Sequence, residues 1–288
     1  MFHLLIFHNA LYPVNMIINF IWGWYIKIKH RGNLIACRVN FPKSTSLWKY
    51  PKESVSKLTI ISPLDYSQTE SLDYLVSLPT DYNTTAKKYP LILFLHGAFE
   101  RGNNVFIVPR HGPLKYFRKN PDFAKTNPFI IVAPQCKRDH YWSHEQMLLL
   151  LDEVERKFRV DSSRIYATGF SLGGYGAYML AAESPKRFAA VVPICGGYLP
   201  SEAAKLCDVS LWIFHGDRDP TVPVTQAMNM AEAIKNAGGR KTKVAIYPNV
   251  GHNIWTQTYC NPDLYNWLLT QTNGSISSIY SGNDSLNK

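Results

Sequence analysis

The chain has 288 residues, of which 46% are hydrophobic and 13% aromatic, so it can bury a full core and is not a disordered chain. Its formal net charge is +10, a value that would suit a nucleic-acid-binding protein. However, the first 60 residues hold eight Lys or Arg and one acid, so most of the charge belongs to this segment. Because no RNA- or DNA-binding motif accompanies it, we expect no nucleic-acid partner.

Residues 1–57 form a basic, partly apolar N-terminal leader. Its apolar run over 11–26 is interrupted by Pro13, Asn15 and Asn19 and is shorter than the ~20 apolar residues of a spanning helix. Basic residues follow this run instead of preceding it, which by the positive-inside rule favours a cytoplasmic location for the domain that follows. Three interpretations stay open: a disordered leader, a membrane-associated segment and an export signal.

Strand signals begin at Leu58. Residues 58–61 and 72–78 resemble two strands of an early hairpin, the second alternating as a half-buried strand does. Several short and continuously apolar runs follow, a pattern typical of parallel strands covered on both faces. These runs are 91–95, 129–133, 165–167, 188–194, 209–214 and 244–247.

Helical segments alternate with these runs. We expect a helix over 145–158 with Ser143 as its cap, and further helices over 172–183, 225–236 and 262–270. The alternation predicts an α/β fold: a doubly wound, mostly parallel sheet with an N-terminal hairpin and helices on both faces. One domain over 58–272 and a polar, flexible tail over 273–288 complete the predicted organisation.

A serine bracketed by glycines follows one predicted strand directly. The run Gly169-Phe170-Ser171-Leu172-Gly173 has the form of a nucleophile elbow, in which a strand turns sharply into a helix. Such a turn holds its middle residue under backbone strain, and small flanking residues let it close. Ser171 is therefore the candidate nucleophile.

A serine hydroxyl needs an imidazole to accept its proton, and that imidazole needs an acceptor that fixes its tautomer. His252 follows the strand ending at residue 247, and Asp217 and Asp219 follow the strand 209–214. The chain order is thus nucleophile, acid, base. Spacing alone leaves the choice between the two carboxylates open.

Taken together, these motifs resemble those of α/β-hydrolases of the prolyl-oligopeptidase-like, feruloyl-esterase-like and phospholipase/carboxylesterase group. The resemblance covers Tyr89 to Leu269 and rests on four motifs in order. They are the oxyanion loop at Leu95–Gly102, the elbow at Gly169–Gly174, the acid loop at His215–Pro223 and the histidine loop at Gly251–Trp255.

The resemblance implies a role for each site residue. Ser171 would be the nucleophile, His252 the general base and then acid, and Asp219 the carboxylate that orients His252, with Asp217 bracing the loop. Backbone N–H groups of Leu172 and Ala98 would form the oxyanion hole. The expected activity is ester hydrolysis through an acyl-enzyme.

Phe99 departs from the pattern of this group, where many members have glycine after the Ala98 position. A bulky residue would be strained there if the loop required positive φ. Phe99, Trp142 and Trp255 are candidate substrate-binding residues of an aromatic cleft that suits a small ester. The alternatives are a serine peptidase acting on short peptides and a non-catalytic binding scaffold with the same fold.

We expect the remaining histidine and cysteine side chains to have structural roles. His96 and His215 at strand ends are expected to brace loops, and Cys195 to be a small buried side chain. The five cysteines have no metal-like spacing and form a poor disulfide framework. Because the triad needs neither metal nor cofactor, none is expected, although one alternative was a metal cluster of Asp139, His140, His144 and Glu145.

Overall fold

A computed structural model of the chain describes residues 19–20, 25–30, 33–40, 54–61 and 69–273, with side chains from residue 71 onward. Of the predicted leader, only residues 19–20, 25–30, 33–40 and 54–57 are among the described residues, and most of the predicted tail lies outside them. The chain divides into two compact units, residues 1–41 with 57–72 and residues 42–56 with 73–288. Within the described part, no helix combines the length and apolar content needed to cross a bilayer.

The first unit contains antiparallel strands. Strand β2 (Tyr25–His30) pairs with β1 (Asn19–Phe20) on one side and with β3 (Asn33–Asn40) on the other. Strand β3 pairs in turn with β4 (Ser54–Ile61), which contains the predicted strand 58–61. The sequence predicted no strand in the segment that holds β1, β2 and β3.

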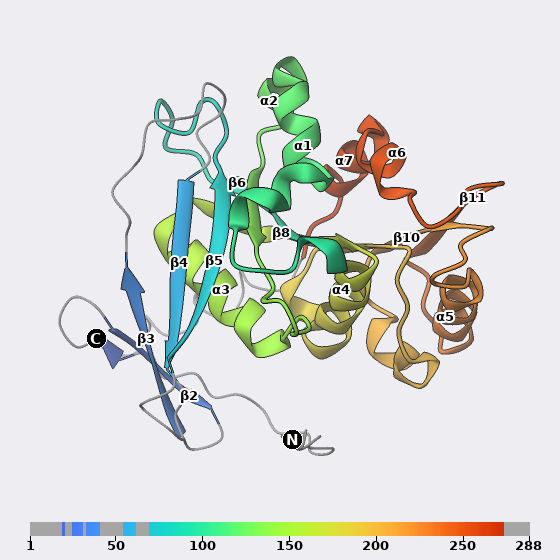
Figure 1. Cartoon of the computed structure of the whole chain (residues 1–288), viewed down its shortest axis with the longest axis horizontal. Coiled ribbons are helices and arrows are strands. Elements are labelled where there is room, and N and C mark those ends of the chain that lie inside the picture. Colours follow the sequence, from blue (N-terminus) through green and yellow to red (C-terminus); the bar gives the residue numbers. More distant parts are fainter. Residues whose placement is uncertain (1–18, 21–24, 31–32, 41–53, 62–68, 274–288) are drawn as a thin grey trace, which may run out of the picture. The chain divides into compact units, whose positions relative to one another are not determined.

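The second unit is built on a seven-stranded sheet that confirms the predicted fold class. The strand order is β5-β7-β6-β8-β9-β10-β11. Strand β5 is antiparallel to β7 and every other pair is parallel. The strands are β5 (Thr69–Ser77), β6 (Tyr89–Leu95), β7 (Ile130–Pro134), β8 (Val160–Phe170), β9 (Ala190–Ile194), β10 (Leu211–Gly216) and β11 (Thr242–Tyr247) (Figure 1).

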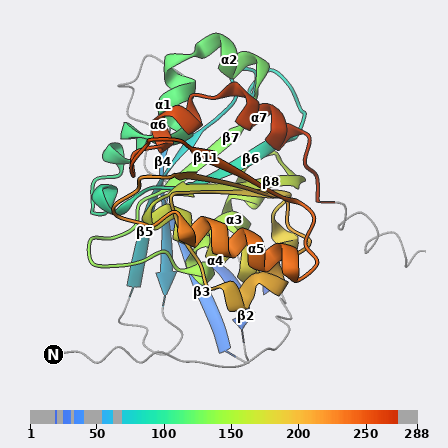
Figure 2. The same cartoon turned by 90° about the vertical axis from the view of Figure 1, so that its right-hand side faces the viewer.

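Helices cover both faces of this sheet. Figure 2 shows α3, α4 and α5 on one face and α1, α2, α6 and α7 on the other. Four predicted helices are confirmed: α3 (His144–Lys157), α4 (Leu172–Glu183), α5 (Thr225–Asn236) and α7 (Pro262–Leu269). The predicted cap of α3 is also present, because the Ser143 hydroxyl accepts a hydrogen bond from the Gln146 N–H at 3.3 Å.

Two expectations need correction. Strand β11 is not covered on both faces, because it is the last strand of the sheet and none of its residues is fully buried. Three helices were not predicted, since they are short and their helical period spans too few turns to register in the sequence. They are α1 (Gly112–Lys119), α2 (Pro121–Thr126) and α6 (Trp255–Tyr259).

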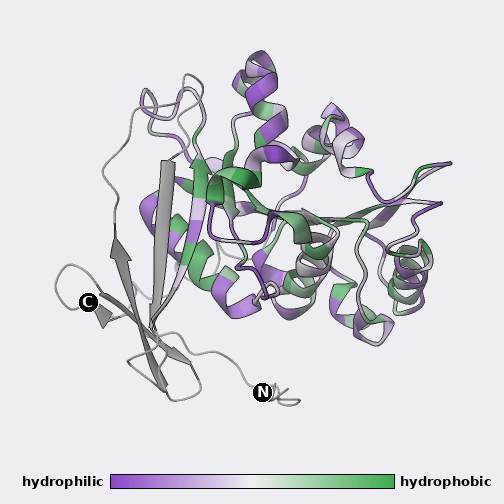
Figure 3. Cartoon of the chain, in the orientation of Figure 1, coloured by the Kyte–Doolittle hydropathy of each residue, from purple (hydrophilic) through white to green (hydrophobic). Residues whose placement is uncertain are grey.

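The pattern of hydropathy explains why these elements pack as they do. Strands β6, β7 and β9 are buried along their whole length. Helix α3 buries Met147, Leu150, Leu151 and Val154, together with the acid Glu153, and its mixture of hydrophobic and polar residues gives it alternating colours in Figure 3. Cys136, Cys195, Cys207 and Cys260 are free thiols, and the side chain of Cys37 lies outside the described residues.

Candidate active site

Ser171 occupies the sharp turn between β8 and α4. Its backbone has φ 53° and ψ −119°, which is the strained conformation that the elbow motif predicted. A Cβ on Gly173 would lie 1.9 Å from the Leu95 carbonyl oxygen, and one on Gly169 would lie 2.3 Å from that of Gly173. The two glycines are therefore required by close backbone packing, which holds the turn against the end of β6.

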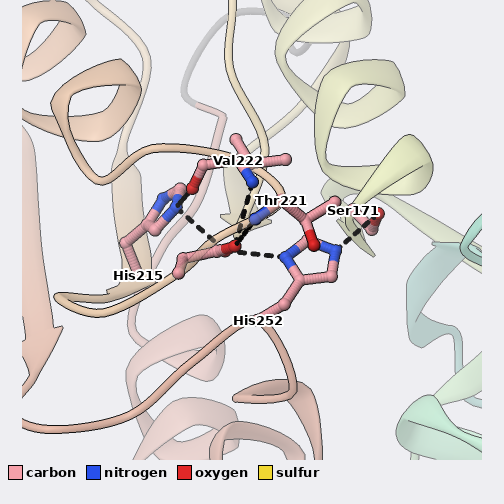
Figure 4. A network of polar contacts seen from close by, with 6 residues as sticks. Ser171, His215, Thr221, Val222 and His252 are labelled. Carbon is pink, nitrogen blue, oxygen red and sulfur yellow. Dashed lines mark hydrogen bonds and ion pairs between the residues drawn. The ribbon is translucent and has the colours of Figure 1, made fainter.

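The structure brings Ser171, His252 and Asp219 together, although 81 residues separate the serine from the histidine. The Ser171 Oγ lies 2.9 Å from His252 Nε2, and His252 Nδ1 lies 2.7 Å from Asp219 Oδ2 (Figure 4). Each residue follows the carboxyl end of a parallel strand, and these ends meet at one edge of the sheet. The three side chains form a continuous hydrogen-bonded relay.

The two candidate carboxylates have opposite environments. Asp219 is 8% exposed, and its Oδ1 accepts hydrogen bonds from the backbone N–H groups of Thr221 and Val222 at 2.8 and 2.9 Å. Asp217 is exposed, and its backbone N–H donates to the Tyr247 carbonyl. Asp219 alone is within hydrogen-bond distance of His252, so the geometry favours it over Asp217.

Hydrogen bonding keeps Asp219 in its charged form. Burial by itself would raise the pKa of this carboxyl group, but hydrogen bonds from His252, Val222 and Thr221 outweigh burial and hold the pKa below its usual value. At neutral pH the carboxylate is therefore ionised and accepts a hydrogen bond from His252 Nδ1–H.

His215 braces the loop that carries Asp219, as the sequence predicted. Its fully buried ring donates from Nε2 to the Val222 carbonyl at 2.8 Å, and the same nitrogen lies 3.3 Å from Asp219 Oδ2. His215 therefore fixes both ends of the turn 219–222. It has no contact with Ser171 in the drawn network (Figure 4).

The oxyanion loop, residues 96–102, begins where β6 ends. Ala98 is the first residue of a short 3₁₀ turn, η1 (Ala98–Glu100), and Leu172 is the first residue of α4. The first N–H groups of a helical segment have no partner within it, so both are available as donors. Phe99 does not adopt positive φ, which occurs among non-glycine residues of the described chain only at Ser171, Cys195 and Asn249. The expected strain at Phe99 is therefore absent.

His96 supports this loop, as predicted. Its Nε2 accepts a hydrogen bond from the Cys136 N–H at 3.0 Å, and its Nδ1 donates to the Gly97 carbonyl at 2.7 Å. Burial lowers the pKa of His96 to about 4, so the ring is neutral at pH 7. A neutral ring is the form that can donate and accept at once.

The predicted substrate-binding aromatic residues occupy three different environments. Phe99 is 94% exposed and directly follows Ala98. Trp255 is partly buried, with its ring 5.5 Å from that of His252 and stacked on Phe170 at 4.5 Å. Trp142 is 7% exposed and donates from Nε1 to the His96 carbonyl at 3.3 Å, which makes it a support of the oxyanion loop and disfavours substrate contact.

The sequence motifs do not indicate the places of several residues that lie near the site. The oxyanion-loop motif contains Glu100 but implies no role for it, and His111 belongs to no motif. Cys195 is fully buried as expected, but it has positive φ (39°), and burial raises the pKa of its thiol to about 12. It is therefore a protonated thiol and an unsuitable nucleophile at neutral pH.

Metal-ligand chemistry is restricted at this site. Donor atoms of Cys195, Asp219 and His252 lie within 4.8 Å of one another. However, Asp219 and His252 are already hydrogen-bonded to each other, and the Cys195 thiol is buried. Two members of the other candidate metal cluster, His144 and Glu145, make hydrogen bonds within the protein. His144 Nε2 is hydrogen-bonded to the Ser184 hydroxyl, and the Glu145 carboxylate accepts a hydrogen bond from the Ser143 hydroxyl.

Comparison with known proteins identifies the group. Residues 138–260, which hold all three relay residues, match the dienelactone hydrolase family. A protein of Aspergillus niger named "Probable feruloyl esterase C" is 27% identical over 197 residues, covering 66% of this chain and 71% of that protein. A solved structure, "Crystal Structure of a Thermostable Esterase", has a TM-score of 0.69 and 26% identity, covering 88% of this chain and 76% of the other. The chain has the α/β-hydrolase fold.

This α/β-hydrolase also has a relative among peptidases. It is 24% identical to "Dipeptidyl-peptidase 5" of Porphyromonas gingivalis, with 62% of this chain matching 32% of that protein. The α/β-hydrolase is therefore an enzyme of the serine hydrolase group, which includes both esterases and peptidases. The resemblance stated from its motifs is confirmed at the level of this group.

Proposed function

We propose that this α/β-hydrolase cleaves carboxylic esters through an acyl-enzyme, with Ser171 as nucleophile, His252 as base and acid, and Asp219 as the orienting carboxylate. One observation carries the proposal. The Ser171 Oγ, the two His252 ring nitrogens and the Asp219 Oδ2 form a chain of hydrogen bonds of 2.9 and 2.7 Å. This arrangement suits activation of a weak nucleophile by a base of fixed tautomer.

In the acylation step, Ser171 Oγ attacks the ester carbonyl carbon while its proton moves to His252 Nε2. The imidazolium that forms is stabilised by Asp219, whose Oδ2 accepts the Nδ1 proton in a hydrogen bond. The carbonyl oxygen becomes an oxyanion that receives hydrogen bonds from the N–H groups of Leu172 and Ala98. The tetrahedral adduct then expels the alcohol, which leaves with the proton from His252.

Deacylation repeats these steps with water. His252 removes a proton from water, the resulting hydroxide attacks the acyl carbon, and Ser171 Oγ leaves with the proton returned by His252. The products are a carboxylic acid and an alcohol. Positive φ at Ser171 supports the same mechanism, because it projects the hydroxyl out of the turn toward His252.

For the substrate, we infer an ester of modest size with an apolar or aryl acyl group. Phe99 is the most exposed of the large hydrophobic side chains of the described residues and lies beside Ala98. Trp255 lies beside His252. An ester bond flanked by these rings would gain apolar contacts on both sides. The name of the Aspergillus niger relative supports an aryl ester.

A serine peptidase is the second candidate function. The similarity to a dipeptidyl peptidase favours it, although that similarity covers 32% of the peptidase. Comparing kcat/KM for p-nitrophenyl esters with kcat/KM for aminopeptidase, dipeptidyl and endopeptidase substrates separates the two. We expect the ester to be the better substrate, and a higher kcat/KM for peptides would replace the ester proposal.

The decisive variant is Ser171→Ala. We expect it to lower kcat by a factor on the order of 10⁶ and to abolish labelling by a fluorophosphonate, because no other group replaces the attacking oxygen. Cys195→Ala is the matched control, since it removes a neighbouring buried group that has no role in the mechanism, and it keeps fluorophosphonate labelling at Ser171. Unlabelled but folded wild-type protein would favour the binding-scaffold alternative.

We also propose that residues 58–272 form the catalytic domain. Strand β5 belongs to it, because residues 74–77 pair with residues 131–134 of β7. A chain truncated to begin at Leu58 should fold and keep wild-type kcat. Loss of folding on this truncation would move the boundary toward the N-terminus.

A further inference from the structure

Glu100 is a buried acid that the proposed mechanism does not use. It is 5% exposed and ends the turn η1, two residues after Ala98. Its Oε2 has no hydrogen-bond partner among the described residues. Burying a carboxylate oxygen that has no hydrogen-bond partner destabilises the folded state. The presence of Glu100 at the end of this turn therefore requires an explanation.

The backbone of Glu100 is hydrogen-bonded on both sides of the residue. The Glu100 N–H donates to the Gly97 carbonyl at 3.4 Å, and the Glu100 carbonyl accepts from Gln135 Nε2 at 2.9 Å. Burial raises the pKa of Glu100, while the N–H groups of Glu100 and Gly97 stabilise its charged form in part. A residue at the third position of a helical turn that faces the N–H of the cap residue ties the start of that turn in place.

His111 connects this carboxylate to the relay residues. Its Nε2 lies 3.9 Å from Glu100 Oε1, and its Nδ1 is buried without a partner in the described part of the chain. The His111 ring meets Phe170 and Trp255 edge-on, at 5.8 and 5.7 Å. Phe170 directly precedes Ser171, and the ring of Trp255 lies 5.5 Å from that of His252.

We propose that Glu100 and His111 are positioning residues that fix the turn Ala98–Glu100, so that the Ala98 N–H group stays aimed at the reacting carbonyl oxygen. A short 3₁₀ turn has few hydrogen bonds of its own, and an oxyanion donor is effective only within a narrow range of distances. Glu100 is buried at the end of this turn, and His111 lies 3.9 Å from its carboxylate while packing edge-on against Phe170 and Trp255. This inference rests on the proposed role of Ala98.

The test uses Glu100→Gln in the full chain, which keeps the size of the side chain and removes its charge. Glu145→Gln is the control, because Glu145 is an exposed acid whose carboxylate accepts from Ser143. Removing one oxyanion donor lowers kcat by 10²–10³, so a misaimed donor should lower it by roughly 10- to 100-fold. We expect KM for a p-nitrophenyl ester to change by less than about twofold, because the donor acts mainly on the transition state.

A second readout separates positioning from a merely structural role. A trifluoromethyl ketone forms a tetrahedral adduct with an oxyanion, so its affinity depends on the same N–H groups. We expect Glu100→Gln to weaken ketone binding by the same factor as it lowers kcat, while the melting temperature and fluorophosphonate labelling at Ser171 stay near wild type. The control Glu145→Gln should change none of these quantities.

His111→Phe keeps the ring contacts and removes both nitrogens. It should lower kcat and ketone affinity together, by a smaller factor than Glu100→Gln. The double variant should lose less than the product of the two single effects, because residues that act as a unit are not additive. If Glu100→Gln does not fold, the kcat and the ketone affinity of His111→Phe test the proposal instead.

The inference is overturned if kcat and ketone affinity in the folded variants equal those of Glu145→Gln. It is also overturned if kcat falls without a parallel loss of ketone affinity. The proposed function fails in a different way, through wild-type protein that does not react with a fluorophosphonate or through a fully active Ser171→Ala variant. The two failures are therefore distinguishable.

Discussion

The elbow at Ser171 and the oxyanion loop lie side by side, but different kinds of interaction hold them. The elbow is formed by backbone strain and by glycines that pack against the end of β6. The oxyanion loop is held by side chains from distant segments, including Gln135 and Trp142. A short motif can therefore specify the first region, while the second depends on residues that no motif contains.

The largest expected effect outside Ser171 is on the relay. Asp219→Asn should lower kcat by roughly 10⁴, because the amide stabilises the wrong tautomer of His252. Asp217→Asn should change kcat by less than about threefold, since the side chain is exposed. Steady-state kinetics on one ester measure both. An inactive Asp217→Asn with an active Asp219→Asn would reverse the assignment of the carboxylate.

The contact between the elbow and β6 can be broken by Gly173→Ala. A Cβ there would lie 1.9 Å from the Leu95 carbonyl oxygen, so the backbone must shift. We expect the free energy of unfolding to fall by about 3 kcal/mol or more and kcat to fall with it, because overpacking displaces the start of the oxyanion loop.

The control for this change is Gly251→Ala. A Cβ on Gly251 meets its nearest atom at 3.7 Å, which is an ordinary contact. Urea unfolding of the two variants provides the comparison. Equal stability of both would show that the backbone at Gly173 can give way, and that the elbow is less rigid than the glycine contacts indicate.

The support of the oxyanion loop by His96 should appear as a pH dependence of stability. The pKa of His96 is about 4 in the folded chain and about 6.5 unfolded, so between these values the unfolded state binds more protons. Its contribution is fully present above pH 6.5 and is lost as pH falls toward 4, by roughly 3 kcal/mol.

His96→Gln isolates this contribution, because glutamine can donate and accept at similar positions without titrating. Urea unfolding at pH 7 and pH 4 should show a loss of stability in wild type that exceeds the loss in the variant by that amount. Equal losses would mean that His96 becomes protonated in the folded state without cost.

The smallest effect is expected from Trp142→Phe. This change keeps the aromatic contact with His96 and removes the hydrogen bond from Nε1 to its carbonyl. The free energy of unfolding should fall by about 1 kcal/mol, and kcat by less than about tenfold. Tyr141→Phe, at an exposed position, is the control. A large rise in KM for Trp142→Phe would instead indicate that Trp142 contacts the substrate.

Much of the fold and of the relay could be predicted from the sequence because the relevant signals are local. Continuous apolar runs gave the central parallel strands, and helical periodicity gave α3 and α4. The elbow, the acid loop and the histidine loop each lie within ten residues. By contrast, the contact of Glu100 with His111 joins a residue of the oxyanion-loop motif to one that lies in no motif, and only the folded chain brings them together.

The same reasoning explains where the sequence-based expectations and the structure differ. Strand β11 has the continuous apolar run of an inner strand, yet its place at the end of the strand order leaves it partly exposed. For Trp142, the sequence favours substrate contact, whereas the edge-on packing of its ring against His96 favours support of the oxyanion loop. Position along the chain cannot tell whether a side chain turns toward solvent or toward the core.

The open edge at β11 bears on the solubility of the enzyme. A last strand with unpaired backbone groups can accept a strand from a second molecule, and edge lysines oppose such pairing by charge repulsion. Lys243 lies within β11 and Lys241 directly precedes it. Acetylation or neutral substitution of this pair would favour edge-to-edge aggregation, which would distort the segment leading from β11 to His252.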